Sequence, residues 1–212
     1  MIRKFFIILF ISFFTFSCST ECDCKKNDDR SFSEIWFPKI INSKKILNYY
    51  SETDTQIVEW TIIGDTIIDG QYGYIEENKF PDNTFFFYWF VNQDSAWMIS
   101  SIDGERDRPF IFPFVQGEWQ LPHNNRMRVN VEGDTIRTSR YLVPQDKTSI
   151  TTANGCYDEC WKILFYDVTD SIGNLDTILI AEDYYAKDVG FVYKIVDSNA
   201  SWEIISCQNC SD

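Results

Sequence analysis

Two runs near the C-terminal end, DTILIAEDYYA (176–186) and GFVYKIV (190–196), decide the fold class of this chain. Both are rich in β-branched and aromatic residues, which favour strands, and Gly190 permits a tight bend or bulge between them. The adjacent residues Tyr184 and Tyr185 would then face opposite sides of a sheet. From its residues, this segment is a hairpin in the core of a β protein, an interpretation favoured over a binding site.

Similar runs cover most of the chain, and helical periodicity is weak throughout. Further strands are expected at 55–63, 65–75, 83–91, 95–102, 108–115, 126–131, 135–143, 160–168 and 201–206. Turns are expected at Gly64-Asp65, Asn92-Gln93-Asp94, Glu132-Gly133-Asp134 and Asp197-Ser198-Asn199. The two prolines in 108–115 indicate an edge or irregular strand, and 38–50 could hold one or two helical turns. The pattern predicts an all-β fold: an antiparallel curved sheet, half-barrel or sandwich, with at most short helices.

The N-terminal segment 1–17 has the features of a secretory signal peptide. Arg3 and Lys4 precede an apolar run that is shorter than the roughly 20 residues needed to span a membrane. Ser17 and Cys18 resemble the cleavage and acylation site of bacterial lipoproteins, which makes Cys18 the predicted lipid attachment site. The alternative is an ordinary signal peptide with an unmodified cysteine nearby.

Acylation of Cys18 would determine where the protein is found. Two or more acyl chains anchor a protein stably, at about 0.8 kcal/mol per buried methylene. Ser19 follows the cysteine, and by resemblance to Gram-negative sorting rules this favours the outer membrane, with the periplasmic and external faces both left open. The polar segment 18–30 is expected to be a flexible tether, and 31–212 a single β domain.

The formal net charge of −13 limits the possible partners. A groove for nucleic acid needs the opposite sign, so nucleic acid is excluded, and direct attraction to anionic headgroups is disfavoured. Aromatic residues make up 17% of the chain, which separates it from acidic disordered sequences. The acidity is explained by the solubility of an exported domain.

Residues for common catalytic sites are scarce. The single histidine, His123, lies in the loop-like stretch QLPHNNR, so zinc motifs with two histidines are impossible, and no GxSxG, P-loop or GxGxxG motif occurs. The neighbouring carboxylates Glu76/Glu77 and Glu182/Asp183 would face opposite sides of a strand, so neither pair qualifies as a glycosidase pair on its own. We expect no enzymatic activity and no cofactor, with carboxylate-based hydrolysis as the remaining enzymatic alternative.

Seven cysteines minus one that is acylated leave an even number, which suits disulfides in an oxidising compartment. The disulfide candidates are Cys22, Cys24, Cys156, Cys160, Cys207 and Cys210. The last four are expected to pair among themselves, while the first two would join each other, the C-terminus or a partner. The spacing of the last four also permits a Cys₄ zinc site, and Cys207 and Cys210 a redox pair, although no metal is expected.

Two further features of the sequence each have two interpretations. Asp-Thr/Ser-aliphatic tripeptides resemble the O-glycosylation sequon of exported Bacteroidetes proteins, but also fit a turn aspartate before a strand; the candidate sites are Thr66, Ser95, Thr135, Ser171 and Thr177. The seven tryptophans lie in or near apolar strands, which makes most of them core residues. They could equally line a cavity for a lipid tail or a sugar face.

Two stretches resemble a family of uncharacterised Bacteroidetes outer-membrane lipoproteins. WFPKI…YY (36–50) with the following GDTIIDGQYGYI resembles their FP-L-x-x-G-x-x-W-x-Y opening, and CWKILFYDV…DYYAKDVGFVYKIV (160–196) resembles their closing YYAKGVGLVK motif, with Asp188 where glycine is usual. The resemblance implies a β-rich fold related to periplasmic lipoprotein carriers, whose half-barrel sheet cups an acyl chain.

These features predict a non-enzymatic, membrane-anchored lipoprotein of the bacterial cell envelope. Its expected role is binding or structural, with a lipid or apolar small molecule as the expected ligand. The alternative is a surface-exposed lipoprotein that binds carbohydrate or protein.

Overall fold

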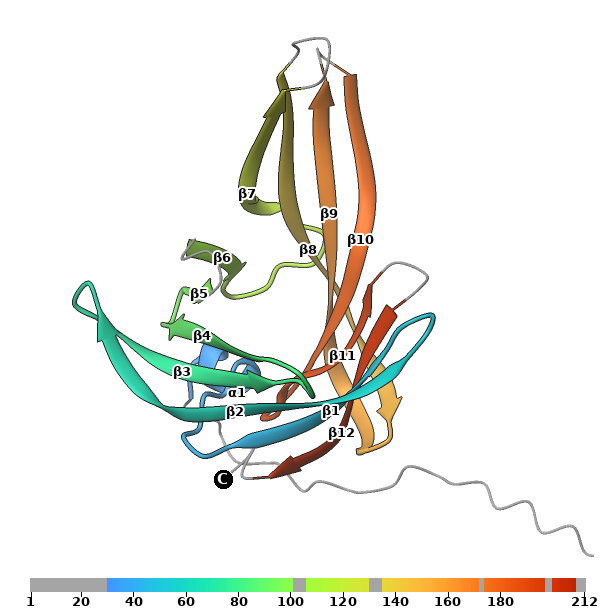
Figure 1. Cartoon of the computed structure of the whole chain (residues 1–212). Coiled ribbons are helices and arrows are strands. Elements are labelled where there is room, and N and C mark those ends of the chain that lie inside the picture. The colour runs from blue at the N-terminus through green and yellow to red at the C-terminus, as the bar shows by residue number, and fades with distance from the viewer. Residues whose placement is uncertain (1–29, 101–105, 130–134, 172–173, 197–199, 209–212) are drawn as a thin grey trace, which may run out of the picture.

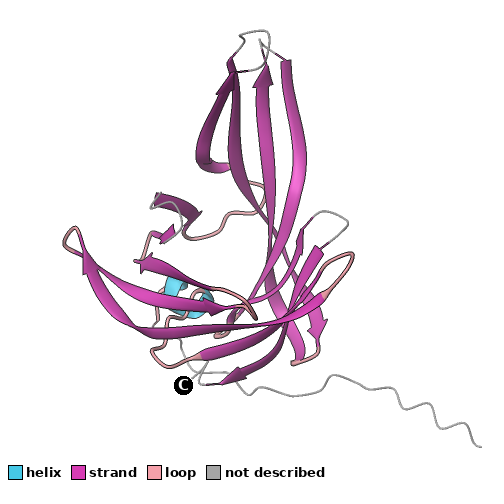
Figure 2. Ribbon diagram, in the orientation of Figure 1, coloured by secondary structure: helices cyan, strands magenta, loops and turns pink. Residues whose placement is uncertain are grey.

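The computed structural model of the chain describes residues 30–100, 106–129, 135–171, 174–196 and 200–208. These residues form one short helix and one antiparallel sheet of twelve strands (Figures 1 and 2). The elements are α1 (Phe32–Trp36), β1 (Lys44–Tyr50), β2 (Thr55–Ile68), β3 (Gln71–Lys79), β4 (Thr84–Val91), β5 (Ser95–Ser100), β6 (Arg106–Ile111), β7 (Gln120–Val129), β8 (Thr135–Thr152), β9 (Gly155–Ser171), β10 (Asn174–Ala186), β11 (Gly190–Val196) and β12 (Ala200–Gln208). The prediction of an all-β fold with a curved sheet is confirmed.

The strand order is β6-β5-β4-β3-β2-β1-β12-β11-β10-β9-β8-β7. Each half of the chain is therefore a meander, and the pairing of β1 with β12 joins the two halves at the centre of the sheet. The sheet curls, so that β2–β4 and β8–β10 form opposite sides of its concave face (Figure 1). The long strands β8, β9 and β10 continue beyond the rest of the sheet as a projecting arm.

A side chain brings the two edge strands together. Gln120, at the start of β7, donates from Nε2 to the carbonyl of Ile111 at 2.8 Å, and its Oε1 accepts from the Ile111 N–H at 3.1 Å. This pair of bonds copies the exchange between two backbone residues in an antiparallel ladder. Because Ile111 ends β6, the amide of Gln120 closes the curved sheet at one point into a barrel-like shape.

Helix α1 begins at a capping box. Ser31 Oγ accepts from the Glu34 N–H at 3.3 Å, while Glu34 Oε2 accepts from the Ser31 N–H at 2.6 Å. The helix places Phe32 against Phe112 and Phe114, which belong to the segment between β6 and β7. Aromatic rings from α1 and from the segment between β6 and β7 pack together in this way.

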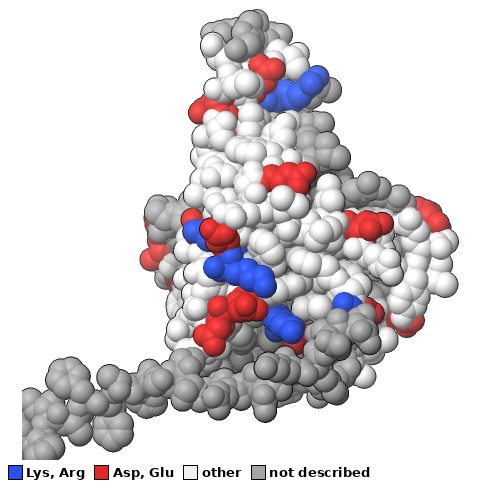
Figure 3. Space-filling model, turned by 180° about the vertical axis from the view of Figure 1, so that it is seen from behind, with Lys and Arg blue, Asp and Glu red and all other residues white. Residues whose placement is uncertain are grey.

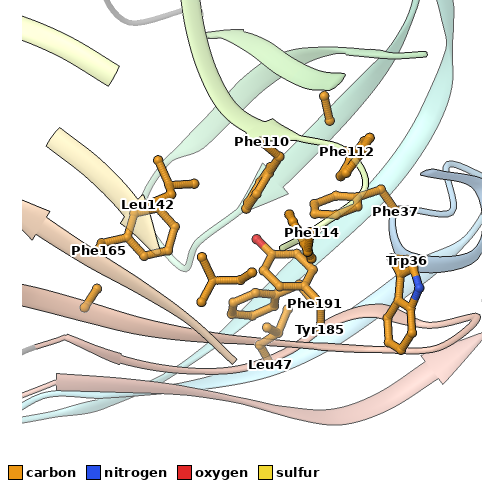
Figure 4. Packing of buried hydrophobic residues seen from close by; sticks show 13 residues of the cluster. Trp36, Phe37, Leu47, Phe110, Phe112, Phe114, Leu142, Phe165, Tyr185 and Phe191 are labelled. Carbon is orange, nitrogen blue, oxygen red and sulfur yellow. The ribbon is translucent and has the colours of Figure 1, made fainter. Parts of the chain in front are cut away.

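The sheet carries apolar clusters on both faces. The larger, inner cluster contains the rings of Trp36, Phe37, Phe110, Phe112, Phe114, Phe165, Tyr185 and Phe191 together with Leu47 and Leu142 (Figure 4). The smaller, outer cluster is built on Cys160, Ala186, Val192 and Ile204. Tyr185 belongs to the inner cluster and Tyr184 packs against the outer one, which confirms that the two tyrosines face opposite sides of the sheet.

The predicted turn at Gly64-Asp65 is wrong, because β2 runs through it with only an irregularity in register between Ile62 and Gly64. The chain turns instead at Asp69-Gly70, where both residues have positive φ, 53° and 76°. Two left-handed residues in a two-residue loop match the twist of the flanking strands, and Asp-Gly is a favoured pair for such a turn. The turn at Asn92 is confirmed, since its Oδ1 accepts from the N–H groups of Asp94 and Ser95.

Two other local predictions are wrong. Residues 38–50 hold no helical turn within the described chain, because β1 pairs on one side with β2 and on the other with β12. The helix forms earlier, where the capping box lies. His123 lies in β7 and not in a loop, opposite Arg140 of β8. The 108–115 segment does supply the edge strand β6, as predicted.

Several predicted features lie outside the described residues. They are the signal peptide (1–17), most of the tether (18–30), the cysteines Cys18, Cys22, Cys24 and Cys210, and the turns at 132–134 and 197–199.

Candidate ligand-binding site

The concave face of the curled sheet holds a partly open cavity of about 380 Å³. This volume is within the range of about 300–1,000 Å³ that is usual for small-molecule sites. Its lining comes from the segment 37–39, from β1 to β6 and from β8 to β12. A second, more polar hollow of about 400 Å³ adjoins it and shares the residues 37–39.

Strand alternation explains which residues line the cavity. On four strands the lining residues are spaced two apart, as strand geometry requires for one face. They are Trp60 and Ile62 of β2, Glu76 and Asn78 of β3, Phe87 and Trp89 of β4, and Ala181, Asp183 and Tyr185 of β10. Each of these strands turns one face inward, and the curl of the sheet directs those faces at one space. The wall is mostly apolar and aromatic, which is the usual character of a pocket for an apolar ligand.

One ion pair in the wall joins the segment after α1 to β3. Lys39 Nζ lies 3.0 Å from Glu76 Oε2, and the two side chains are only 12% and 10% exposed. The same ammonium lies 4.1 Å from the centre of the Trp89 ring, within range of a cation–π interaction. Lys39 is therefore held by a carboxylate and an aromatic face at once.

A second ion pair lies across the cavity on the C-terminal hairpin. Lys194 Nζ of β11 is 3.2 Å from Asp183 Oδ1 of β10, and the Tyr185 hydroxyl donates to Asp183 Oδ2 at 3.5 Å. Burial raises the pKa of the Asp183 carboxyl, and Lys194 opposes this rise. Burial, followed by the nearby charges of Asp183 and Glu76, raises the pKa of Tyr185 well above its usual range, so this hydroxyl stays protonated.

Lys45 of β1 is the third lysine at the cavity. Its Nζ donates to the carbonyl of Phe191 at 3.3 Å. Burial and, to a smaller extent, the nearby charge of Lys39 lower the pKa of the Lys45 ammonium to about 7, although Glu76 opposes this shift. Lys45 keeps some accessible surface because it lines the cavity. Protein atoms nevertheless surround it at longer range, and these account for the effect of burial on its pKa.

Gly190 makes room for Lys45. Its φ is +78°, and a Cβ built on it would lie 3.3 Å from Lys45 Nζ and 3.3 Å from Pro38. A side chain at this position would be strained and would press on the lysine. Asp188, two residues earlier, also has a positive φ of 63°, a conformation that glycine adopts most easily and that aspartate tolerates.

The structure changes how the carboxylate pairs are interpreted. Glu76 and Asp183 are buried, and Glu77 and Glu182 are only partly buried, which confirms the predicted alternation. However, Glu76 and Asp183 face the same cavity from β3 and β10, a pairing between distant segments that the sequence did not indicate. Each of them is bound by a lysine.

The tryptophans divide into three groups. Trp60, Trp89 and Trp202 line the cavity, while Trp36, Trp97 and Trp161 pack in or against the core. Trp119 is 49% exposed and lies outside both groups. The indole N–H groups of Trp60, Trp89 and Trp161 are buried, and the described residues supply no hydrogen-bond partner for them.

The predicted disulfides of Cys156 and Cys160 are wrong. Cys160 is a fully buried free thiol in the outer cluster, and it is not bonded to Cys156. Both lie on β9, four residues apart, so their Cα atoms are separated by roughly 13 Å, well beyond the span of a disulfide. Burial raises the pKa of the Cys160 thiol to about 12. The pairing of Cys207 involves residues outside the described chain and stays a prediction.

The proposed glycosylation sites lie on five different strands. Thr66 is on β2, Ser95 begins β5, Thr135 begins β8, Ser171 ends β9 and Thr177 is on β10. Thr135 and Thr177 are exposed, and the other three are partly exposed. Their modification stays a prediction.

Within the described residues, no group of three or more His, Cys, Asp or Glu side chains is placed to hold a metal ion. The same part of the chain contains no helix long and apolar enough to cross a membrane.

The fold of the chain is similar to that of two solved structures of bacterial proteins. A candidate lipoprotein of Parabacteroides distasonis superposes with a TM-score of 0.55 at 13% identity, over 82% of this chain and 98% of that one. A candidate exported protein of Bacteroides fragilis with a YmcC-like fold superposes with a TM-score of 0.52 at 11% identity, over 82% and 99%. At these identities the likeness is one of fold. No protein-family model and no curated protein sequence matches the chain.

Proposed function

We propose that this protein is a non-enzymatic lipoprotein of the cell envelope, anchored in the outer membrane through Cys18, that holds an apolar ligand in the cavity of its curled sheet. The observation that carries the proposal is the cavity itself, of about 380 Å³, with its aromatic wall. A domain that only had to be stable would fill this space with side chains, since natural interiors are packed densely. The two solved structures of similar fold are candidate lipoprotein and exported proteins, which agrees with an envelope location.

The carboxylates of the wall support binding over hydrolysis. Glu76 and Asp183 each have a lysine within ion-pair distance, at 3.0 Å and 3.2 Å. A general acid or base must be within hydrogen-bond reach of a substrate proton, and here lysines occupy that reach.

The test is native mass spectrometry of the whole protein carrying Cys18→Ser. The substitution removes the predicted acylation site, so the protein should be recovered in the soluble fraction without detergent. A mass in excess of the polypeptide that is lost on denaturation is the expected result. A variant that stays membrane-bound after removal of residues 1–17 would contradict the anchor, and a protein recovered only at its polypeptide mass would contradict the ligand.

A second candidate function, binding of a carbohydrate at the cell surface, is favoured by one feature. Trp119 is half-exposed and stacks on Tyr166 at a centroid distance of 5.1 Å and an interplanar angle of 25°, with Tyr141 at its edge. An exposed aromatic platform of this kind suits the apolar face of a sugar ring. A loss of glycan binding in Trp119→Ala, with the cavity ligand retained, would identify this function.

A further inference from the structure

The cavity has a local charge opposite to that of the whole chain. Four cationic residues line it, Lys39, Lys45, Arg140 and Lys194, against the two carboxylates Glu76 and Asp183. The chain as a whole has a formal net charge of −13. A surplus of cations at one enclosed place in such an acidic protein calls for an explanation that general solubility does not give.

Three of these four cations have a carboxylate partner. Lys39 is paired with Glu76, Lys194 with Asp183, and Arg140 makes a two-pronged contact with Asp167 at 2.8 and 3.1 Å. Lys45 has no carboxylate within ion-pair distance among the described residues, and its only hydrogen bond there is the one to the Phe191 carbonyl. An ammonium has three donors, so Lys45 retains donors that can reach an acceptor in the cavity.

Two further donors in the wall are without an acceptor. The indole N–H groups of Trp60 and Trp89 are buried, and no described atom accepts from them. Both rings line the cavity. Buried polar groups in proteins are nearly always hydrogen-bonded, so these two N–H groups are donors available to an acceptor within the cavity.

The geometry points to a ligand with an anionic oxygen head on a single apolar chain, with Lys45 as the residue that receives the head. This inference rests on the proposed function and specifies its ligand. The aromatic wall takes the chain, and the uncompensated ammonium of Lys45 takes a carboxylate or phosphate oxygen as a charge-assisted hydrogen bond. Trp60 and Trp89 offer further donors to the same head.

The acidity of the chain does not oppose this assignment. Its net charge acts at the outer surface, where it disfavours adsorption to an anionic membrane. Inside the wall, the field is set by the nearest groups, and burial strengthens their interactions relative to water. A single amphiphile that enters the cavity therefore meets cations, while a lipid surface meets acidic residues.

The experiment is displacement of a neutral fluorescent naphthylamine from the purified Cys18→Ser protein by amphiphiles that share one chain. The competitors are dodecanoate, dodecyl phosphate, dodecanol and dodecylamine. Dodecanoate or dodecyl phosphate is expected to displace the probe at a concentration about tenfold or more below that of dodecanol, the size of one charge-assisted hydrogen bond. Dodecylamine is expected to be the weakest. The order of the two anions distinguishes a carboxylate from a phosphate head.

A matched pair of variants assigns the effect to one residue. In Lys45→Met, the advantage of the anions over dodecanol is expected to fall to within about threefold, while the probe still binds through apolar contact. In Lys44→Met, the advantage should be unchanged, because Lys44 is the next residue on the same strand, faces the other side and lies 2.8 Å from Glu59.

The outcomes separate the two levels of the proposal. A probe that does not bind to the Cys18→Ser protein overturns the proposed function and this inference together. A probe that binds but is displaced equally by dodecanoate, dodecyl phosphate and dodecanol overturns this inference alone. The comparison of head groups on the protein with Lys45 intact is decisive in itself, so the proposal does not depend on the folding of Lys45→Met.

Discussion

The inner and outer faces of β10 each present a carboxylate and a tyrosine, and each carboxylate has a lysine from a neighbouring strand, β11 on the inside and β9 on the outside. On the inner face, Asp183 has Lys194 at 3.2 Å and accepts from the Tyr185 hydroxyl at 3.5 Å. On the outer face, the matching carboxylate Glu182 has Lys162 at 2.7 Å and accepts from the Tyr184 hydroxyl at 3.0 Å. The outer contacts are shorter, although the outer set is the more exposed one.

The two faces differ in the free energy that is needed to keep the carboxylate ionised. The Asp183 side chain is 6% exposed and its burial raises its pKa, so its ionised form is disfavoured despite Lys194. On the rear view of the molecule, charged side chains of both signs lie close together in a band across the lower half, where solvent can screen them (Figure 3). The inner charges are therefore not placed for stability, and perturbed charges in a cavity are typical of functional sites.

The largest test of this comparison is Lys45→Met, which should make the empty protein more stable at pH 6. The pKa of Lys45 is lowered from its usual value to about 7. While the group is charged, each pKa unit of this lowering reduces the free energy of unfolding by about 1.4 kcal/mol. Discounting for its partial exposure to the cavity, we expect a gain of about 2–4 kcal/mol in the free energy of unfolding, measured by urea denaturation.

The sign of the pH dependence follows from proton uptake. Between about 7 and 10.5 the unfolded chain binds more protons at Lys45 than the folded one, so the stability of the protein with Lys45 rises with pH in this window. The gain in Lys45→Met should therefore be greatest at pH 7 and below and vanish near pH 10.5. The facing groups Lys39, Glu76 and Asp183 are common to both proteins and largely cancel. A gain that does not decline with pH would contradict the assignment.

A smaller effect is expected from neutralising the two carboxylates of the hairpin. Asp183→Asn should stabilise the empty protein at pH 7.5, by less than Lys45→Met, because it removes a buried charge whose pKa is raised. The matched variant Glu182→Gln should stay within about 0.5 kcal/mol of the unmodified protein. Urea denaturation of both variants at pH 7.5 and pH 4 measures the difference.

The acid measurement is the control for Asp183. A raised pKa means that the stability contributed by protonated Asp183 is fully present below the unfolded pKa and is lost as pH rises through the folded one. The advantage of Asp183→Asn should therefore shrink at pH 4. If Asp183→Asn instead lost more stability than Glu182→Gln at pH 7.5, the ion pair with Lys194 would be a net stabilising contact and the comparison of the two faces would fail.

Local signals in the sequence predicted the architecture, because most strands are recognisable from their own β-branched and aromatic residues. The runs that became β4, β5 and β9–β12 were all expected, as was the edge strand. The prediction at Gly64-Asp65 was wrong because the turn lies at Asp69-Gly70, whose two residues are both left-handed. A strand can pass a glycine through a bulge, so a glycine alone does not locate a turn.

The cavity was beyond local signals because it is built from many strands. Glu76 and Asp183 come together only when β3 and β10 face each other across the curled sheet. One signal was available: Lys45 stands two residues before Leu47, a fully buried core residue, so alternation places a lysine on an apolar face. Such a lysine is a candidate site residue in any strand.

The smallest expected effect is the coupling between Lys162 and Glu182 on the outer face. A double-mutant cycle with Lys162→Met and Glu182→Gln should give about 0.5 kcal/mol at low salt, falling toward zero at 1 M salt, because partly exposed pairs are screened. The equivalent cycle with Lys194→Met and Asp183→Asn should give a larger coupling that changes less with salt, since solvent ions do not reach a buried carboxylate. Equal couplings with equal salt dependence would mean that the cavity does not shield its charges, and the head-binding role of Lys45 would lose its electrostatic basis.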